Sequence, residues 1–100
     1  MRDIMGLLKE GAYIVEGIKG IKFKLADTIS ELGTSRNKIA VESKTRPATI
    51  LDLAAGDTKT IKLETVVNIL DALNDIAREK GIDRVIGIGD IIEYIPTAER

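Results

Sequence analysis

The sequence predicts one mostly α-helical domain in which two short β-strands, one near each end of the chain, pair with each other. Three observations support this prediction. Residues 35–55 have the pattern of two short helices joined by a tight turn, and residues 63–77 carry an apolar stripe at helical spacing. Apolar and basic residues alternate at 21–25, and a short apolar run at 91–95 ends before Pro96, so both segments favour strands.

The first nineteen residues are predicted to be an extension that precedes this domain. Their apolar residues fall on one helical face, but glycines interrupt it, so we expect a short helix only as far as Lys9 or Glu10, ended by Gly11. The extension is apolar, and two roles are open to it. It either covers the domain's own core or supports dimerisation.

The first helix of the domain is expected at residues 25–32. Leu25, Ile29 and Leu32 recur at helical spacing, and Gly33 ends the run. Thr34 or Ser35 is expected to cap the next helix through a side-chain oxygen.

Residues 35–55 are expected to form a helix-turn-helix unit. The first of its helices runs to about Glu42, and its small Ala40 allows a second helix to cross closely. Pro47 suits a first helical position, and Ile50 begins the buried stripe of the second helix. Ile50 lies ten residues after Ala40, a separation that brings both side chains into one core.

A polar loop at 56–62 begins at Gly56, the expected end of the second helix. A long helix should follow and end at Gly81. Its predicted buried stripe is Leu63, Val66, Val67, Leu70, Leu73 and Ala77. The strand at 91–95 is expected to pair with the one at 21–25, which would bring Phe23 and Tyr94 together.

Several motifs occur in a recognisable order between residues 20 and 96. They are Arg46-Pro47-Ala48-Thr49-Ile50, Gly56-Asp57-Thr58-Lys59, Leu63-Glu64-Thr65-Val66, Asp71-Ala72-Leu73 and Gly89-Asp90-Ile91-Ile92-Glu93-Tyr94-Ile95-Pro96. In this order they resemble the Cro/lambda-repressor-like (Xre-type) family of helix-turn-helix DNA-binding domains. The resemblance implies a compact five-helix domain at residues 20–96, between an extension at 1–19 and a tail at 97–100.

The sequence departs from the family pattern at the turn and after the long helix. Lys44 stands where relatives usually have glycine, so the chain must either carry a positive φ on a lysine or form another turn. Thr45 stands where an apolar residue is usual, and Ser43 is also small and polar. About eleven extra residues, 75–85, intervene before the Gly-Asp ending.

In a helix-turn-helix unit the second helix lies in the major groove with its outward side chains near base edges. The expected base-reading residues are Arg46, Ala48, Thr49 and Asp52. Arg46 suits a bidentate contact to guanine, whereas Ala48, Thr49 or Leu51 suits a thymine methyl group. Asp52 has two interpretations: it accepts from cytosine N4, or it pairs with a lysine or arginine on the protein surface.

Cationic and hydroxyl side chains around this unit are the expected phosphate contacts. They are Thr34, Arg36, Lys38, Lys44, Thr58, Lys59 and Thr60. Residues 19–62 hold nine Lys/Arg against five Asp/Glu, whereas residues 63–100 hold four against eight. Two interpretations of this distribution are open at a net charge of −1: a basic middle third that binds phosphates, or an ordinary solvated surface of mixed charge.

These observations predict a transcriptional regulator that occupies double-stranded DNA, acting as a homodimer on two half-sites. The alternative is a protein-interaction module on the same fold, such as an anti-repressor, which the exposed Leu51, the outward Asp52 and a sequence pI near 5.5 would suit. The two differ in salt dependence, because release of counterions makes DNA binding weaken steeply as salt rises.

No catalytic site is expected. The chain has no cysteine or histidine, which makes a structural zinc site very improbable, and no cofactor or small-molecule substrate is suggested. Gly87-Ile88-Gly89 lacks the third glycine and the context of a dinucleotide site, and the carboxylate pairs Glu10/Glu16 and Asp71/Asp75 have no motif partner. No apolar run is long enough for a membrane helix, so we expect a cytoplasmic protein.

Overall fold

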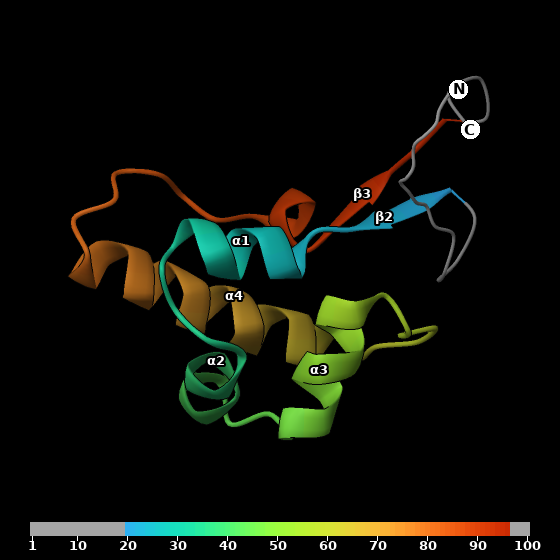
Figure 1. The fold of residues 1–100 in the computed structure, drawn as a ribbon, viewed down its shortest axis with the longest axis horizontal. Coiled ribbons are helices and arrows are strands. Elements are labelled where there is room, and N and C mark those ends of the chain that lie inside the picture. The colour runs from blue at the N-terminus through green and yellow to red at the C-terminus, as the bar shows by residue number, and fades with distance from the viewer. Residues whose placement is uncertain (1–19, 97–100) are drawn as a thin grey trace, which may run out of the picture.

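The computed structural model describes residues 20–96, which pack four α-helices and a two-stranded antiparallel sheet around one core (Figure 1). The elements in chain order are β2 (Ile21–Phe23), α1 (Leu25–Glu31), α2 (Arg36–Ser43), α3 (Pro47–Ala55), α4 (Leu63–Glu79), the single 3-10 turn η1 (Ile88–Asp90) and β3 (Ile92–Tyr94). In Figure 1, α1 and the β2–β3 ribbon lie above α4, and α2 and α3 lie below it. The helix expected before Gly11 and the tail at 97–100 lie outside the described residues.

The predicted pairing of the two strands is confirmed. Ile21 lies opposite Tyr94, Lys22 opposite Glu93, and Phe23 opposite Ile92. Phe23 and Tyr94 are therefore two positions apart in the register and do not face each other directly. Leu25, expected both at the end of the strand and at the start of the first helix, belongs to α1, where it is fully buried.

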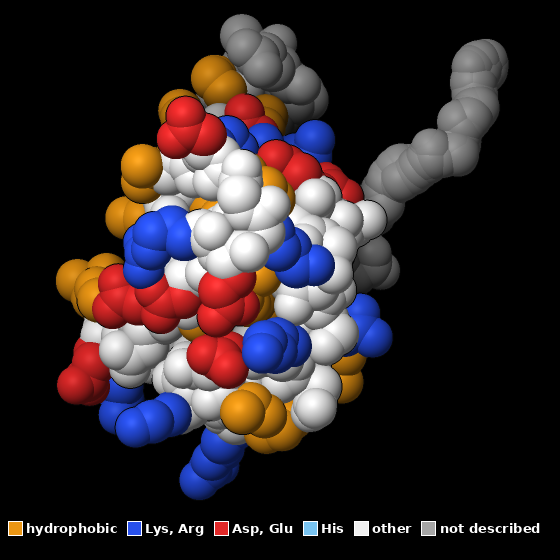
Figure 2. All heavy atoms as spheres, turned by 90° about the vertical axis from the view of Figure 1, so that its left-hand side faces the viewer, with side chains coloured by type: hydrophobic (Ala, Val, Ile, Leu, Met, Phe, Trp, Pro, Cys, Tyr) orange, Lys and Arg blue, Asp and Glu red, His pale blue; other side chains and the backbone are white. Residues whose placement is uncertain are grey.

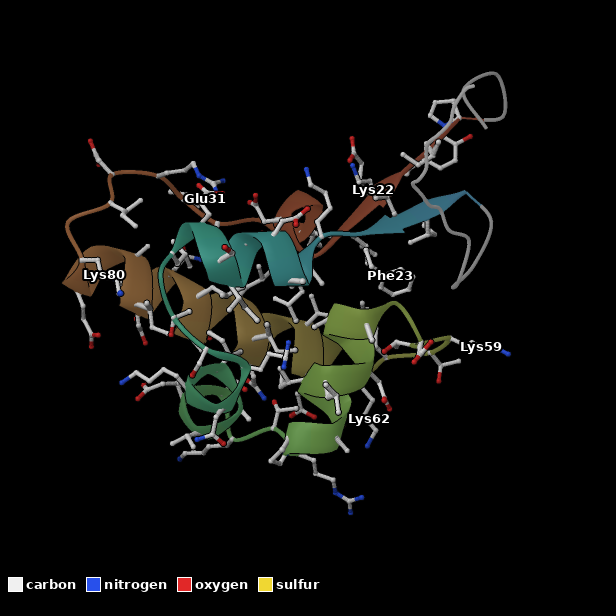
Figure 3. The ribbon with its side chains drawn as sticks, viewed as in Figure 1. Lys22, Phe23, Glu31, Lys59, Lys62 and Lys80 are labelled. Atoms are coloured by element: carbon white, nitrogen blue, oxygen red, sulfur yellow. The ribbon has the colours of Figure 1, made fainter. Side chains whose placement is uncertain are left out.

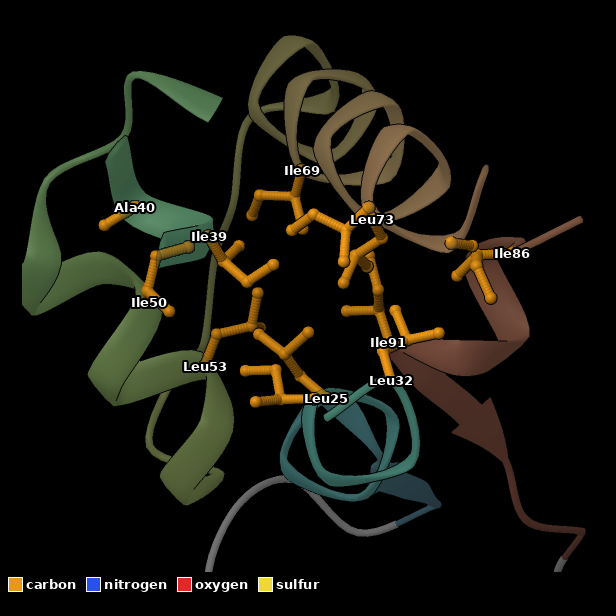
Figure 4. Close-up of a cluster of buried hydrophobic side chains, with 13 residues drawn as sticks. Leu25, Leu32, Ile39, Ala40, Ile50, Leu53, Ile69, Leu73, Ile86 and Ile91 are labelled. Atoms are coloured by element: carbon orange, nitrogen blue, oxygen red, sulfur yellow. The ribbon is translucent and has the colours of Figure 1, made fainter. Parts of the chain in front are cut away.

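The core lies between the four helices and the C-terminal segment (Figure 4). Its buried apolar residues are Leu25, Ile29, Leu32, Ile39, Ala40, Ile50, Leu53, Ile69, Leu73, Ile76, Ala77, Ile86 and Ile91. The expected stripe of the first helix is confirmed, as is the meeting of Ala40 with Ile50 in one core. Each large aliphatic side chain buried in this way contributes roughly 1.5 to 3 kcal/mol of favourable transfer free energy.

The predicted buried face of α4 is wrong at the N-terminal half of the helix. Leu63 and Val67 are 79% and 54% exposed, whereas Ile69 and Ile76 fill the core. Apolar residues occur on more than one side of this helix, so spacing alone is compatible with several faces. Contact with α2 selects the side that carries Ile69 and Ile76.

The expectation of five helices is also corrected, since residues 20–96 contain four α-helices. After α4 the chain makes only the short turn η1. Three glycines, Gly81, Gly87 and Gly89, fall within nine residues of this segment, and each costs up to about 1 kcal/mol in a helix interior.

Side chains fix this glycine-rich segment onto the helices. The Asn74 amide accepts a hydrogen bond from the Ile86 N–H at 2.8 Å and donates to the Ile86 carbonyl at 3.0 Å. The Arg84 guanidinium donates to Glu31 of α1 at 2.8 Å and to Asp90 at 3.0 Å. The extra residues that set this chain apart from the family pattern thus extend α4 and then return along it.

Candidate nucleic-acid interface

The turn between α2 and α3 sets the angle at which α3 is presented. Lys44 has φ 56 and ψ 39, so the lysine itself adopts the left-handed conformation. The Thr45 N–H then donates to the Ala40 carbonyl at 2.9 Å and closes the end of α2. At the other end of α2, Ser35 rather than Thr34 is the cap, because its Oγ accepts from the Lys38 N–H at 3.1 Å.

The polar residues at the end of α2 are satisfied locally. Ser43 is buried, and its hydroxyl donates to the Ile39 carbonyl at 2.6 Å and lies 2.9 Å from the Thr45 hydroxyl. A polar pair in place of apolar residues therefore costs no unpaired buried group. The departure from the family pattern is structurally accommodated.

The outward face of α3 agrees with the sequence prediction. Arg46, Ala48 and Asp52 are exposed, and Thr49 is half-buried at the margin of that face. Leu51 is 51% exposed on the same side. The four residues predicted to read bases thus have the accessibility that role requires.

A groove of about 620 Å³ runs between the α2–α3 turn and the start of α4. Its lining residues are Lys44, Thr45, Arg46, Thr49, Thr60, Ile61, Lys62, Thr65 and Asn68. None of these nine is acidic, three are cationic, and five carry a hydroxyl or amide. Such a concentration of hydrogen-bond donors and positive charge beside a candidate recognition helix is suited to a phosphate backbone.

The structure brings together only some of the residues predicted to contact phosphates. Lys44 and Thr60 line the groove together with Arg46 and Thr49. Thr58 and Lys59 instead border a smaller apolar hollow beneath the β-ribbon, formed with Ile21, Phe23, Leu53, Ile61 and Ile92, which Thr60 also borders. Figure 3 shows Lys59 at the tip of the loop, pointing away from α3, and Lys62 beside α3.

The remaining predicted phosphate contacts lie around the start of α2. Arg36 is exposed on the side of α2 that faces α3, where it borders a separate hollow with Asn37, Pro47 and Leu51. Lys38 is exposed but forms an ion pair with Glu42 at 3.4 Å. Thr34 is half-buried, and its N–H donates to the Ile29 carbonyl at 3.1 Å. Neither Lys38 nor Thr34 lines the groove.

Five groove residues were not among the predicted contacts, namely Thr45, Ile61, Lys62, Thr65 and Asn68. The last three follow one another at intervals of three residues along the start of α4, so they share one side of that helix. This polar series is visible in the sequence. The apolar pattern at Leu63, Val66 and Val67 in the same stretch favours a different face as the one that matters.

The expected ion pair of Asp52 is not found within residues 20–96. Among the ion pairs within residues 20–96, none involves this carboxylate, although it is exposed on α3. The simpler of its two interpretations is therefore wrong for the described part of the chain. The base contact of Asp52 stays a prediction.

The charge pattern on the side that lies at the left of Figure 1 differs from that of the groove. There, acidic and basic side chains are interspersed, as Figure 2 shows. Arg84 and Asp90 belong to the segment after α4, and Arg78 pairs with Asp75 on α4. Burial raises the pKa of Asp90, but hydrogen bonds from the Gly87 N–H and the Arg84 guanidinium outweigh it, and the net shift is downward. These pairs are structural.

Comparison with protein-family models, with curated proteins and with solved structures finds no match for this chain. Within residues 20–96, no helix combines the length and apolar character needed to cross a membrane. The same residues contain no cluster of three or more acidic side chains arranged to hold a metal ion.

Proposed function

We propose that the protein binds double-stranded DNA and regulates transcription by occupying an operator, with α2 and α3 acting as a helix-turn-helix of the Cro/lambda-repressor-like type. In this proposal α3 enters the major groove, and Arg46, Ala48, Thr49 and Asp52 face the bases. The DNA backbone beside α3 lies in the groove that Lys44 and Lys62 border.

The observation that carries the proposal is the groove itself. It combines three cations with threonine and asparagine donors, contains no carboxylate, and adjoins the exposed face of α3. A surface devoted to apolar protein contacts would not need this composition. The net charge of −1 does not oppose it, because steering depends on the local field.

A homodimer is part of the same proposal. One small domain buries limited surface on DNA, and two copies on half-sites about 34 Å apart would double the contact.

The proposal is tested by fluorescence anisotropy of a random-sequence duplex titrated with the protein at several salt concentrations. The variant Lys44→Ala/Lys62→Ala removes two groove cations. The matched control Lys22→Ala/Arg78→Ala makes the same change in net charge on the β-ribbon and on the far part of α4.

The wild-type protein should bind with a steep negative slope of log affinity against log salt, of about −0.9 per phosphate contacted. The groove variant should lose about two units of that slope, while the control keeps it. Equal slopes for the two variants would exclude the groove as the phosphate site. No binding even at low salt would exclude DNA as the partner.

The second candidate, a protein-interaction module, is favoured by two exposed residues of α3. Leu51 is half-exposed and apolar, and Asp52 has no ion-pair partner within residues 20–96. Binding to a protein partner through these residues should change little with salt, which separates it from DNA binding in the same titration.

A further inference from the structure

A hollow of about 190 Å³ lies between the start of α2 and the outward face of α3. Pro47 and Leu51, one turn apart on α3, supply its apolar surface. Arg36 and Asn37 of α2 supply its polar rim. It is separate from the groove on the other side of the α2–α3 turn, because the two share no lining residue.

The two helices that form the hollow are held firmly. Ile39 and Ala40 of α2 and Ile50 and Leu53 of α3 are all buried in the core. The exposed side chains of Pro47 and Leu51 are therefore presented on a fixed backbone, and proline adds its own restriction of φ. A preformed apolar surface of this kind recognises a small shape without a large ordering cost.

Leu51 is the largest apolar side chain on this face, because the other exposed residues of α3 are Pro47, Ala48, Asp52 and Ala55. Half of a leucine side chain is left in water at the centre of a candidate DNA-contacting helix. A phosphate or a hydrogen-bonding base edge gains nothing from it. Among the atoms that B-DNA presents in the major groove, the C5-methyl group of thymine is the apolar one.

We propose that the Pro47–Leu51 hollow receives the C5-methyl group of a pyrimidine, which makes Leu51 a specificity-determining residue for thymine. This inference rests on the proposed function and goes further by assigning one kind of base to one pair of side chains. The charges fit this occupant, since none of the four lining residues is acidic and the cationic Arg36 lines the hollow from α2, which suits the phosphate next to a bound base.

The test begins with a duplex selected from a random pool for binding to the full chain. Each thymine of that duplex is then replaced singly by deoxyuridine, which removes the methyl group and leaves the hydrogen-bonding edge unchanged. Anisotropy titrations should reveal a position, repeated in any second half-site, where the replacement weakens binding about fourfold. That factor corresponds to about 0.8 kcal/mol, the transfer free energy of one buried methylene-sized group.

In Leu51→Ala the same position should become indifferent, with thymine and uracil duplexes bound equally. Leu51→Met keeps an apolar side chain of similar volume and should retain most of the preference. Leu63→Ala is the matched control, because Leu63 is also an exposed leucine, 79% accessible, but lies on α4 and borders neither hollow nor groove. It should keep the full preference for thymine.

The outcomes separate this inference from the function on which it rests. A selected duplex that tolerates uracil at every position, or a preference that survives in Leu51→Ala, would overturn the methyl assignment and leave DNA binding standing. Failure to enrich or bind any duplex would overturn both.

Discussion

Lys44 occupies a backbone conformation that the other helix ends of this domain assign to glycine. Gly33, Gly56 and Gly81 have positive φ after α1, α3 and α4, and Lys44 is the single non-glycine residue of the described chain that does. A Cβ in this region costs roughly 1 to 2 kcal/mol. Since the Lys44 side chain also lines the basic groove, its charge gives a reason to retain a strained residue at the turn.

Replacing this residue should move stability and DNA affinity in opposite directions. We expect Lys44→Gly to raise the free energy of unfolding by up to about 1 kcal/mol, because glycine removes the strain but gains freedom in the unfolded chain. The variant should also lose about 0.9 of the salt slope of DNA binding. Urea denaturation and anisotropy titration measure the two effects.

The control for this prediction is Lys44→Ala, which removes the charge and keeps a Cβ at positive φ. It should lose the same part of the salt slope without gaining stability. If Lys44→Gly were no more stable than Lys44→Ala, the left-handed turn would not exist in solution.

At the scale of single elements, the sequence was informative where one pattern excluded the others and ambiguous where several fitted. Pro47 and Gly56 delimit α3, and both bounds were correct to within a residue. The phase of α4 was not, because apolar residues occur around much of its N-terminal half. The groove residues Lys62 and Thr65 were missed for the same reason, since their role depends on which side of α4 faces outward.

The corrected face of α4 predicts unequal effects for two similar truncations. Ile76→Ala should lower the free energy of unfolding by about 2 to 5 kcal/mol, because the side chain is 2% exposed and its loss leaves a cavity. Leu63→Ala should change it by no more than about 0.5 kcal/mol, because that side chain is 79% exposed. Chemical denaturation of both variants measures the difference. A large loss in Leu63→Ala alone would restore the face that the spacing first suggested.

The Asp90 carboxylate, in the segment after α4, leads us to expect that the fold loses stability in acid. Burial raises the pKa of Asp90. Two hydrogen bonds lower it by more than burial raises it: the Gly87 N–H donates to Oδ2 at 2.9 Å, and the Arg84 guanidinium donates to Oδ1 at 3.0 Å. The folded-state pKa therefore lies below the unfolded value. The ionised carboxylate therefore stabilises the fold above about pH 4, the ordinary value for aspartate, and that contribution is lost as pH falls through the folded pKa.

Asp90→Asn should accordingly be less stable than the wild type at pH 7, by about 1 to 2 kcal/mol for the lost charged hydrogen bonds. The difference should shrink below pH 4. Thermal unfolding of both proteins from pH 7 to pH 2 tests this, and Asp83→Asn, an exposed change in the same segment, is the control. A constant difference across this range would mean that the Asp90 charge does not stabilise the fold.

For the molecule as a whole, the order of the elements and the pairing of the two strands followed from the sequence, whereas the grouping of the functional side chains did not. The predicted contacts Thr58, Lys59 and Thr60 follow one another in the chain, yet Thr60 lines both the groove and the hollow beneath the β-ribbon, whereas Thr58 and Lys59 line the hollow alone. Proximity in sequence could not show this, because the direction of each side chain depends on how the loop at 56–62 crosses between α3 and α4.

This division predicts that DNA engages one side of the molecule. On addition of a duplex, the largest changes in backbone amide chemical shift should fall on residues 36–55, which include both helices of the turn, and on residues 60–68 of the groove wall. The β2–β3 ribbon and residues 81–94 should change little, because they lie on the other side of α4 (Figure 1). A ¹⁵N correlation spectrum of the full chain, recorded at two salt concentrations, measures this. Changes that concentrate on residues 81–94 and vary little with salt would place the contact surface on the segment after α4, and the extra residues of this chain would then be the part that binds its partner.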